Sequence, residues 1–338
     1  MKQTYNMDTN SLNIKDVRII LNGEEYMLIP VDRDIREESE EHTPTLVSFV
    51  KQLVKEIKLE GRKRTAETYQ CALNSFLRFW QQDDIDLKQI NTHIITKYEH
   101  FLHAKGIIPN SSSFYMRVFR AIYNQAVSSG LTVDKKPFKN VYTGIGKTIK
   151  RAISIDKIQK IYQLENLTRH EALARDLFLF SLYTRGMSFI DMAYLKKENL
   201  KNGILTYQRH KTKQEITIRW ETQMQEIINK YPSYNNGYLL PIIKRTNGHE
   251  ISQYRECQRL VNNMLKSIGQ KAGITEPLTM YVARHSWASI VHSMNVPISL
   301  ICNGMGHTSE HTTQIYLKSL DSSRLDDINA ELINAVCL

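Results

Sequence analysis

Two short segments near the end of the chain hold residues whose types and spacing suit chemistry at a phosphate. Residues 303–316 read NGMGHTSEHTTQIY and place Tyr316 nine residues after His307. A phenol is a nucleophile, but its ordinary pKa of about 10 means that it needs help to lose its proton at neutral pH. Residues 278–289 read LTMYVARHSWAS and hold Arg284. A guanidinium can bind two phosphate oxygens at once through parallel charge-assisted hydrogen bonds.

These segments resemble the boxes of the phage-integrase, or tyrosine recombinase, family. One family box runs Leu-Gly-His, Ser, Thr-Thr and then the nucleophilic Tyr nine residues after the His, which His307 and Tyr316 match. A second box runs His-x-x-Arg-His, which Arg284 and His285 match, with Tyr281 in place of the first His. Tyrosine can donate a hydrogen bond to a phosphate oxygen but is a poorer proton shuttle. This variation is similar to recombinases of mobile elements and DNA inversion systems of gut bacteria.

The position of the first family arginine is the largest departure from the pattern. The family runs Thr-Gly-x-Arg-x-x-Glu/Asp-Leu, which puts Asp191 at the acid and Ser188 at the arginine. Arg185 lies three residues upstream, and residues three apart can share one face of a helix. We expect Arg185 to substitute for the missing arginine; the alternative is that Ser188 keeps the position and another arginine serves.

A lysine completes the set that the resemblance implies. The family places it in the turn of a β-hairpin between these boxes, and residues 203–220 favour such a hairpin with a polar turn near 210–214. Lys211 aligns best, and Lys213 is the competitor. The implied reaction has Tyr316 attack a DNA phosphate, with the arginines and His307 binding its oxygens and Lys211 protonating the 5′-oxygen.

The resemblance implies no cofactor and no metal. Transfer to Tyr316 keeps the bond energy in a 3′-phosphotyrosyl link, so rejoining needs no ATP. The histidines His285, His307 and His311 lack the HExxH or Cys/His spacing of a metal site. No Cys-x-x-Cys pair occurs among the four scattered cysteines, which fits a reducing cytoplasm.

The elements that must position these residues are mostly helical. The fold expected is mainly α with small β-hairpins: a helical core-binding domain and a mixed α/β catalytic domain, which the resemblance closes as a C-shaped clamp on DNA. The expected divisions are a β-hairpin and acidic linker at 1–42, the helical domain at 43–134, a basic linker at 135–153, the catalytic domain at 154–321 and a C-terminal helix at 322–338. That helix packs in cis or docks on a neighbouring protomer.

Charge indicates a polyanionic partner. Residues 1–42 carry 5 Lys/Arg and 10 Asp/Glu, a net charge of −5, so residues 43–338 carry a net +15 and the whole chain +10. The residues expected to contact DNA are Arg62, Lys63, Arg64, Lys147, Lys150, Arg151 and His285. Arg62 to Arg64 are expected in a turn, where phosphate contact and plain solvation are both open.

The resemblance implies double-stranded DNA at specific sites as partner, a homotetramer on two paired sites, and DNA-bending accessory proteins as a further possibility. No apolar run of transmembrane length and no secretory leader stand out, so a cytoplasmic, nucleoid-associated protein is expected. Alternatives are a type IB topoisomerase-like nicking and closing enzyme and a DNA-binding protein without activity. Integration and inversion are not separated.

Overall fold

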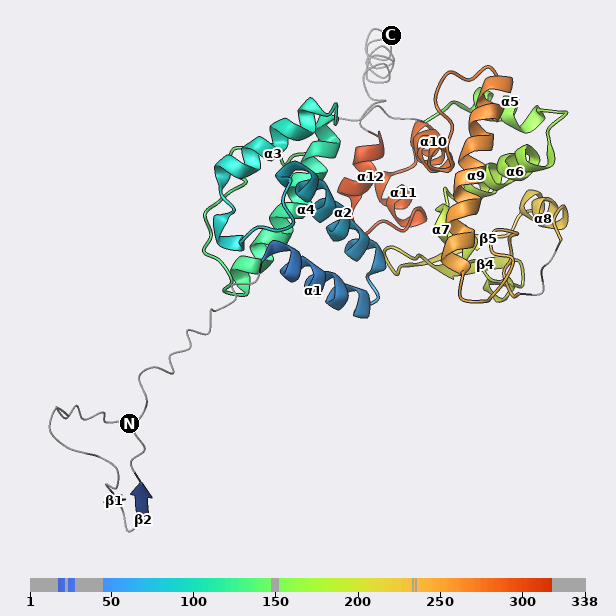
Figure 1. The fold of residues 1–338 in the computed structure, drawn as a ribbon. Helices are drawn as coiled ribbons and strands as arrows, with labels where there is room; N and C mark the ends of the chain where they lie inside the picture. Colours follow the sequence, from blue (N-terminus) through green and yellow to red (C-terminus); the bar gives the residue numbers. More distant parts are fainter. Residues whose placement is uncertain are drawn as a thin grey trace, which may run out of the picture. The chain divides into compact units, whose positions relative to one another are not determined.

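The computed structural model divides the chain into two compact units, Met1–Lys147 and Thr148–Leu338 (Figure 1). Each unit is described by itself. The described residues are 18–21, 24–27, 45–146, 152–232, 234 and 236–317. The expected C-terminal helix at 322–338 lies outside them.

The chain's first described element is a two-stranded hairpin. Strands β1 (Arg18–Leu21) and β2 (Glu24–Met27) pair antiparallel with Leu21 opposite Glu24. This pairing is that of the β-hairpin expected within residues 1–42.

Four α-helices form the core of the first unit: α1 (Leu46–Leu59), α2 (Lys63–Trp80), α3 (Thr92–Ala104) and α4 (Pro109–Ser128). Thr45 caps α1 by accepting a hydrogen bond from the Ser48 backbone N–H, and Asn91 caps α3 in the same way. The buried rings of Phe76, Tyr98 and Phe119 pack against one another where these helices meet.

Helix α4 begins at Pro109, because proline, which lacks a backbone N–H, fits the first turn of a helix. One local expectation for this unit is wrong. Arg62 to Arg64 do not all lie in a turn: Arg62 is the N-cap residue of α2, and Lys63 and Arg64 start the helix.

The described part of the expected linker packs on the first unit. Phe138 and Val141 are buried in its core, and the side chain of Arg117 on α4 donates to the Gly144 carbonyl at 2.9 Å. Residues 135–146 therefore act as part of the helical unit, and the division between units falls after Lys147.

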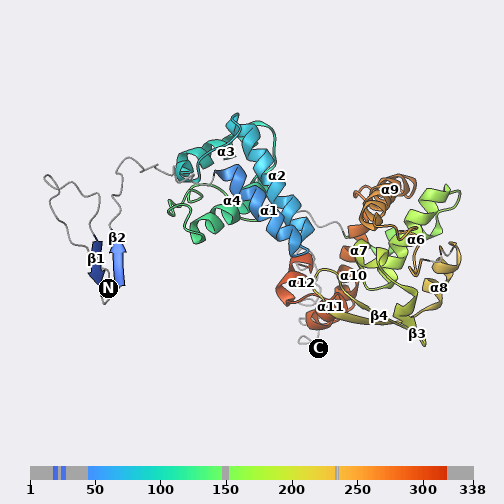
Figure 2. The ribbon, with the colours of Figure 1, turned by 60° about the horizontal axis from the view of Figure 1, so that its bottom comes forward.

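The second unit combines eight α-helices and a small sheet within its described residues. The helices are α5 (Ile155–Gln163), α6 (Arg169–Tyr183), α7 (Phe189–Ala193), α8 (Thr222–Asn229), α9 (Glu250–Lys271), α10 (Met280–Ser293), α11 (Ile298–Gly304) and α12 (Glu310–Leu317). The sheet has the order β3 (Leu200–Lys201), β4 (Ile204–Gln208), β5 (Glu215–Arg219). Figure 2 shows α10, α11 and α12 gathered on one side of this unit.

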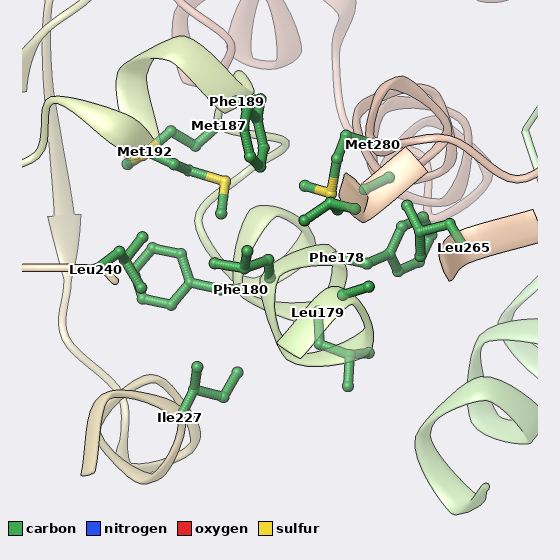
Figure 3. Close-up of a cluster of buried hydrophobic side chains, with 14 of the residues drawn as sticks. Phe178, Leu179, Phe180, Met187, Phe189, Met192, Ile227, Leu240, Leu265 and Met280 are labelled. Atoms are coloured by element: carbon green, nitrogen blue, oxygen red, sulfur yellow. The ribbon is translucent and has the colours of Figure 1, made fainter. Parts of the chain in front are cut away.

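Helix α6 is the centre of this unit because it is apolar on several faces. Phe178 points toward Leu265 of α9, whereas Phe180 points the other way, toward Leu240 (Figure 3). All four side chains are buried. Because α6 is buried on opposite faces, the position of its C-terminal end is well defined. The loop that follows Tyr183 is the first segment of the candidate site.

The hairpin register defines the second site element. Ile204 pairs with Arg219 and Gln208 with Glu215, so residues 209–214 form the turn. This confirms the hairpin and turn expected for 203–220.

No helix in the described residues is long and apolar enough to cross a membrane.

Candidate active site

The centre of the site is a buried arginine on α10. Arg284 is 2% exposed, and its Nη1 donates to the Gly186 carbonyl at 2.7 Å. Its Nη2 donates to the Met305 carbonyl at 2.7 Å and lies 2.9 Å from Nε2 of His307. One guanidinium therefore joins three segments that are far apart in the sequence. Arg284 and His307, which match two separate family boxes, are in direct contact in the structure.

His307 is held as a neutral imidazole. Its Nδ1 lies 2.8 Å from Oγ1 of Thr313, a fully buried side chain of α12. Burial, followed by the nearby positive charges of Arg284, Arg209 and Lys211, lowers the pKa of His307 to about 4. Because Arg284 can only donate, Nε2 of His307 accepts, and Nδ1 carries the proton toward Thr313.

The turn between α6 and α7 needs a glycine where it meets Arg284. Gly186 has φ of +72°, and a Cβ at this position would lie 2.8 Å from Cα of Arg284. Only glycine combines this backbone conformation with so close an approach. This explains in physical terms why the residue after Arg185 is glycine.

A second buried arginine, which the sequence analysis did not select, lies at the base of the hairpin turn. Arg209 is 7% exposed, and its Nη1 donates to the Gly306 carbonyl at 2.6 Å. Its Nε lies 3.9 Å from Oδ2 of Asp191. A buried arginine is retained only with acceptors or an anion nearby, so its position beside the His307 loop marks it as a site residue.

Ser188 and Asp191 show what occupies the place of the usual arginine. Ser188 caps α7, and its hydroxyl donates to Oδ2 of Asp191 at 2.6 Å. The other carboxylate oxygen of Asp191 accepts the backbone N–H of His210 at 2.8 Å. The acid expected from the pattern therefore ties α7 to the hairpin turn, next to Arg209.

The candidate lysines lie in that turn. Lys211 and Lys213 are both exposed, and Lys213 has φ of +60°. The charge of Lys211 is among those that lower the pKa of His307. The turn therefore presents both lysines, and Lys211 is the one whose charge acts on His307.

Arg185 lies at the margin of the same site. Its φ is +59°, and its side chain is half-buried along a groove lined by Trp287, Leu300 and Gly304. Its charge acts on the buried Tyr207, whose pKa is raised by burial, together with the charges of Arg284 and Arg209. The structure thus offers two arginines, Arg185 and Arg209, for the missing family position.

Tyr281 and His285 share one face of α10. Their rings meet edge to face with centroids 4.5 Å apart, and Tyr281 is 54% exposed. The phenol of Tyr281, which stands where the family has histidine, is therefore accessible to a ligand, and its ring packs against the ring of His285.

The residue expected to be the nucleophile lies on α12. Tyr316 is part of this helix, three residues after Thr313, but its side chain lies outside the described part of the structure. Helix α12 contacts both α10 and α11, so the segment carrying Tyr316 is joined to the elements that carry Arg284 and the His307 loop.

The expected DNA contacts of the first unit are exposed. Arg62 pairs with Glu60 and Arg64 with Glu67, each at 3.1 Å, and Lys63 is exposed. Lys147, Lys150 and Arg151 lie outside the described residues. Searched over the described residues, no group of three His, Cys, Asp or Glu side chains is placed to hold a metal ion.

Sequence comparisons match both units. The phage integrase SAM-like domain matches residues 45–143, and the phage integrase family matches residues 151–323. The tyrosine recombinase XerA of Pyrococcus furiosus is 26% identical over 268 residues, which are 78% of this chain and 86% of that protein. XerD of Listeria innocua is 21% identical over 278 residues, covering 78% of this chain and 90% of its own length.

Solved structures show the same fold. A lambda integrase dimer (residues 75–356) bound to a COC′ core site superposes with a TM-score of 0.62 at 17% identity, covering 80% of this chain and 95% of that one. The XerH recombinase in a post-cleavage complex with a palindromic difH substrate gives 0.58 at 17% identity, covering 78% of each chain. With its catalytic-unit match over residues 151–323, this chain belongs to the phage integrase family of tyrosine recombinases.

Proposed function

We propose that this site-specific DNA recombinase uses Tyr316 to cleave and rejoin double-stranded DNA through a 3′-phosphotyrosyl link. The observation that carries the proposal is the buried contact between Arg284 and His307, 2.9 Å apart, with the charges of Arg209 and Lys211 beside it. Such a cluster of cationic donors suits a phosphate whose charge grows as a fifth oxygen attacks.

In this mechanism the phenolic oxygen of Tyr316 bonds to phosphorus, and the bond from phosphorus to the 5′-oxygen breaks. Arg284 binds the non-bridging oxygens with charge-assisted hydrogen bonds. Lys211 gives a proton to the leaving 5′-oxygen, and the proton of the phenol passes to solvent or to a neighbouring base. Attack by the 5′-hydroxyl of another strand reverses the steps and frees Tyr316.

Arg209 is our candidate for the missing first arginine. It reaches the His307 loop from the hairpin, with Ser188 and Asp191 filling the usual position from α7. Its charge lowers the pKa of His307, so it acts at the same point as Arg284. Arg185, the candidate from sequence, is then a residue of the groove beside the site.

Tyr281 and His307 would complete the oxygen-binding set. The exposed phenol of Tyr281 can donate a hydrogen bond where the family has histidine. A bound phosphate anion favours the protonated form of a neighbouring imidazole, so DNA binding raises the pKa of His307 and gives it a second proton to donate.

The assembly we propose is a tetramer on two paired sites, with the first unit and the basic residues at 147–151 contacting the duplex. Support comes from the fold shared with lambda integrase, a tetramer of which was solved on a Holliday junction with a TM-score of 0.61 to this chain. Residues 322–338 would dock on a neighbouring protomer, accessory DNA-bending proteins would shape the sites, and the nucleoid would be the place of action.

The test is covalent trapping on DNA. A library of nicked duplexes with randomised arms beside the nick is incubated with the protein, and DNA linked to protein is recovered and sequenced. Wild type should select a defined sequence, and Tyr316→Phe should recover none. Adducts with Tyr316→Phe, or none with wild type, would contradict the proposal and favour a different nucleophile or an inactive DNA-binding protein.

A second measurement separates recombination from topoisomerase-like activity. The selected sequence is cloned twice into one supercoiled plasmid. A recombinase exchanges the segment between the two copies, whereas a nicking and closing enzyme only relaxes the plasmid. Direct and inverted copies then distinguish excision from inversion.

A further inference from the structure

The turn that carries Lys211 is hydrogen-bonded to the His307 loop mainly at one carbonyl group, that of Gly306. The Gly306 oxygen accepts from Nη1 of Arg209 at 2.6 Å and from Oγ1 of Thr212 at 3.0 Å. The side-chain amide of Gln214, with its nitrogen turned toward the loop, donates to the same oxygen at 2.8 Å. Three side chains of one turn thus converge on one acceptor.

The packing shows that this approach is close. Gly306 has φ of +61°, and a Cβ there would lie 2.7 Å from Cδ1 of Ile216 and 3.1 Å from Cδ of Arg209. Both contacts come from the hairpin. A side chain at residue 306 would have to displace the side chains of Ile216 and Arg209, so the glycine before His307 allows the hairpin side chains to lie against the loop.

The same turn is held from its other side by α7. The backbone N–H of His210 donates to Asp191, as described above. Lys211 therefore lies between two anchored neighbours, His210 on the α7 side and Thr212 on the loop side. Its own side chain is exposed, so its reach is set by where these neighbours hold the backbone.

We propose that Thr212 is a positioning residue, whose hydroxyl holds the turn on the Gly306 carbonyl and thereby presents the Lys211 ammonium group at the leaving 5′-oxygen. The inference rests on the proposed function, because it presumes that Lys211 protonates that oxygen. Arg209 shares the acceptor but also places a charge in the site. Thr212 contributes only the hydrogen bond, which makes its role separable by experiment.

The test uses a leaving group that needs no proton. In a suicide duplex whose 5′-bridging oxygen is replaced by sulfur, the departing group is a thiolate, which leaves without first being protonated because thiols, with pKa values of about 8.5, are far stronger acids than alcohols. An oxygen leaving group needs the acid. Loss of a general acid therefore slows cleavage of the oxygen duplex and spares the sulfur duplex. Both duplexes carry the sequence selected by the wild-type protein.

Thr212→Val should slow adduct formation on the oxygen duplex by about 10-fold, in line with loss of about 1 to 1.5 kcal/mol of hydrogen bonding. On the sulfur duplex it should match wild type. Thr212→Ser, which keeps the hydroxyl, should react normally on both. Lys211→Met should show the same pattern as Thr212→Val with a larger loss on oxygen, about 100-fold or more.

Thr206→Val is the matched control, because Thr206 lies in β4 of the same hairpin and its hydroxyl contacts only Thr217 among the described hydrogen bonds. It should react like wild type. Equal slowing of Thr212→Val on both duplexes, or no slowing on either, would overturn the inference while leaving the proposed function intact. Failure of wild type on both duplexes would overturn the proposed function itself.

Discussion

Nη2 of Arg284 donates to Nε2 of His307 across 2.9 Å, while Nδ1 of the same imidazole faces Oγ1 of Thr313 at 2.8 Å. The two contacts fix both the ring and its tautomer before any DNA is bound. A neutral histidine beside two arginines is poised to change its protonation state when an anion enters.

The first prediction concerns the titration of His307. Its pKa is lowered to about 4 by burial and by the like charges of Arg284, Arg209 and Lys211. In protein labelled with carbon-13 histidine, the His307 resonance should keep its neutral shift from pH 7.5 to pH 5. Because its folded pKa lies below the ordinary 6.5, the folded state loses stability as pH falls from 6.5 toward 4.

The resonance is assigned by its absence in His307→Gln. Lys211→Met removes one of the like charges and should move the titration to higher pH. The selected DNA site should do the same by adding a phosphate. Titration of His307 near pH 6.5 in the free wild-type protein would contradict the neutral, arginine-bonded imidazole.

The second prediction concerns Gly186. Alanine at this position meets both an unfavourable φ of +72° and the backbone of Arg284 at 2.8 Å. Strain and overpacking together should cost roughly 3 kcal/mol of the free energy of unfolding. Gly203→Ala is the matched control, since its φ is +74° with no atom within 4 Å, and it should cost only about 1 kcal/mol.

Both variants are measured by urea unfolding in a Trp80→Phe background. The remaining tryptophans, Trp220 and Trp287, then report the second unit alone. Equal losses for Gly186→Ala and Gly203→Ala would show that the close approach to Arg284 has no energetic consequence.

Much of the fold was predictable because the signals are local. The hairpin at 203–220 alternates apolar and polar residues, and the strands form where that alternation occurs. The start of α2 was missed because three consecutive basic residues suggest a solvated turn, whereas the helix begins at Lys63 and its first buried residue is Ala66. The packing of 135–146 was missed because Phe138 and Val141 are isolated apolar residues in a basic segment.

Site residues that belong to motifs of fixed spacing along the chain were predictable, whereas site residues defined by contact between two distant segments were not. Arg284 and His307 stand in recognisable boxes, and the structure brings them together. Arg209 has no neighbour in sequence that marks it as special. Its meaning comes from Gly306, 97 residues away, whose carbonyl it binds. Ser188 did give a signal: a serine at the family's arginine position implies that another cationic side chain takes the place of that arginine.

A third prediction concerns the buried carboxylate that joins α6 to α9. Glu171 accepts from Lys271 at 2.8 Å and from Ser267 at 2.7 Å, and these bonds, with those from Thr168, lower its pKa to about 2. Glu171→Gln should reduce the free energy of unfolding by about 2 kcal/mol at pH 7. Urea unfolding in the Trp80→Phe background measures it.

The pH dependence gives this prediction its sign. A carboxylate whose folded pKa lies below its ordinary 4.5 stabilises the fold above that pH, and the contribution is lost as pH falls from 4.5 toward 2. The difference between wild type and Glu171→Gln should therefore shrink over that interval. Glu221→Gln, which breaks an exposed pair with Arg219, should cost less than about 1 kcal/mol and serves as control. A pH-independent difference would contradict the assignment.

The last prediction decides between the two arginines offered for the missing family position. Arg209→Ala should lower adduct formation by about 100-fold or more, because it removes a buried donor at the point where charge develops. Arg185→Ala should cost less than about 10-fold, because its side chain lies along the groove beside the site. Binding of the uncleaved site, measured by fluorescence anisotropy, should remain within a few-fold for both.

Moving the charge back to α7 sharpens the comparison. Ser188 occupies the family's arginine position next to Asp191, so Ser188→Arg combined with Arg209→Ser returns the guanidinium to the usual element while keeping the net charge. The double variant should recover adduct formation relative to Arg209→Ser alone. Sulfur in the bridging position should not rescue Arg209→Ser, because an arginine that binds the non-bridging oxygens is needed whichever group leaves. Normal trapping by Arg209→Ala together with loss in Arg185→Ala would instead assign the role to Arg185.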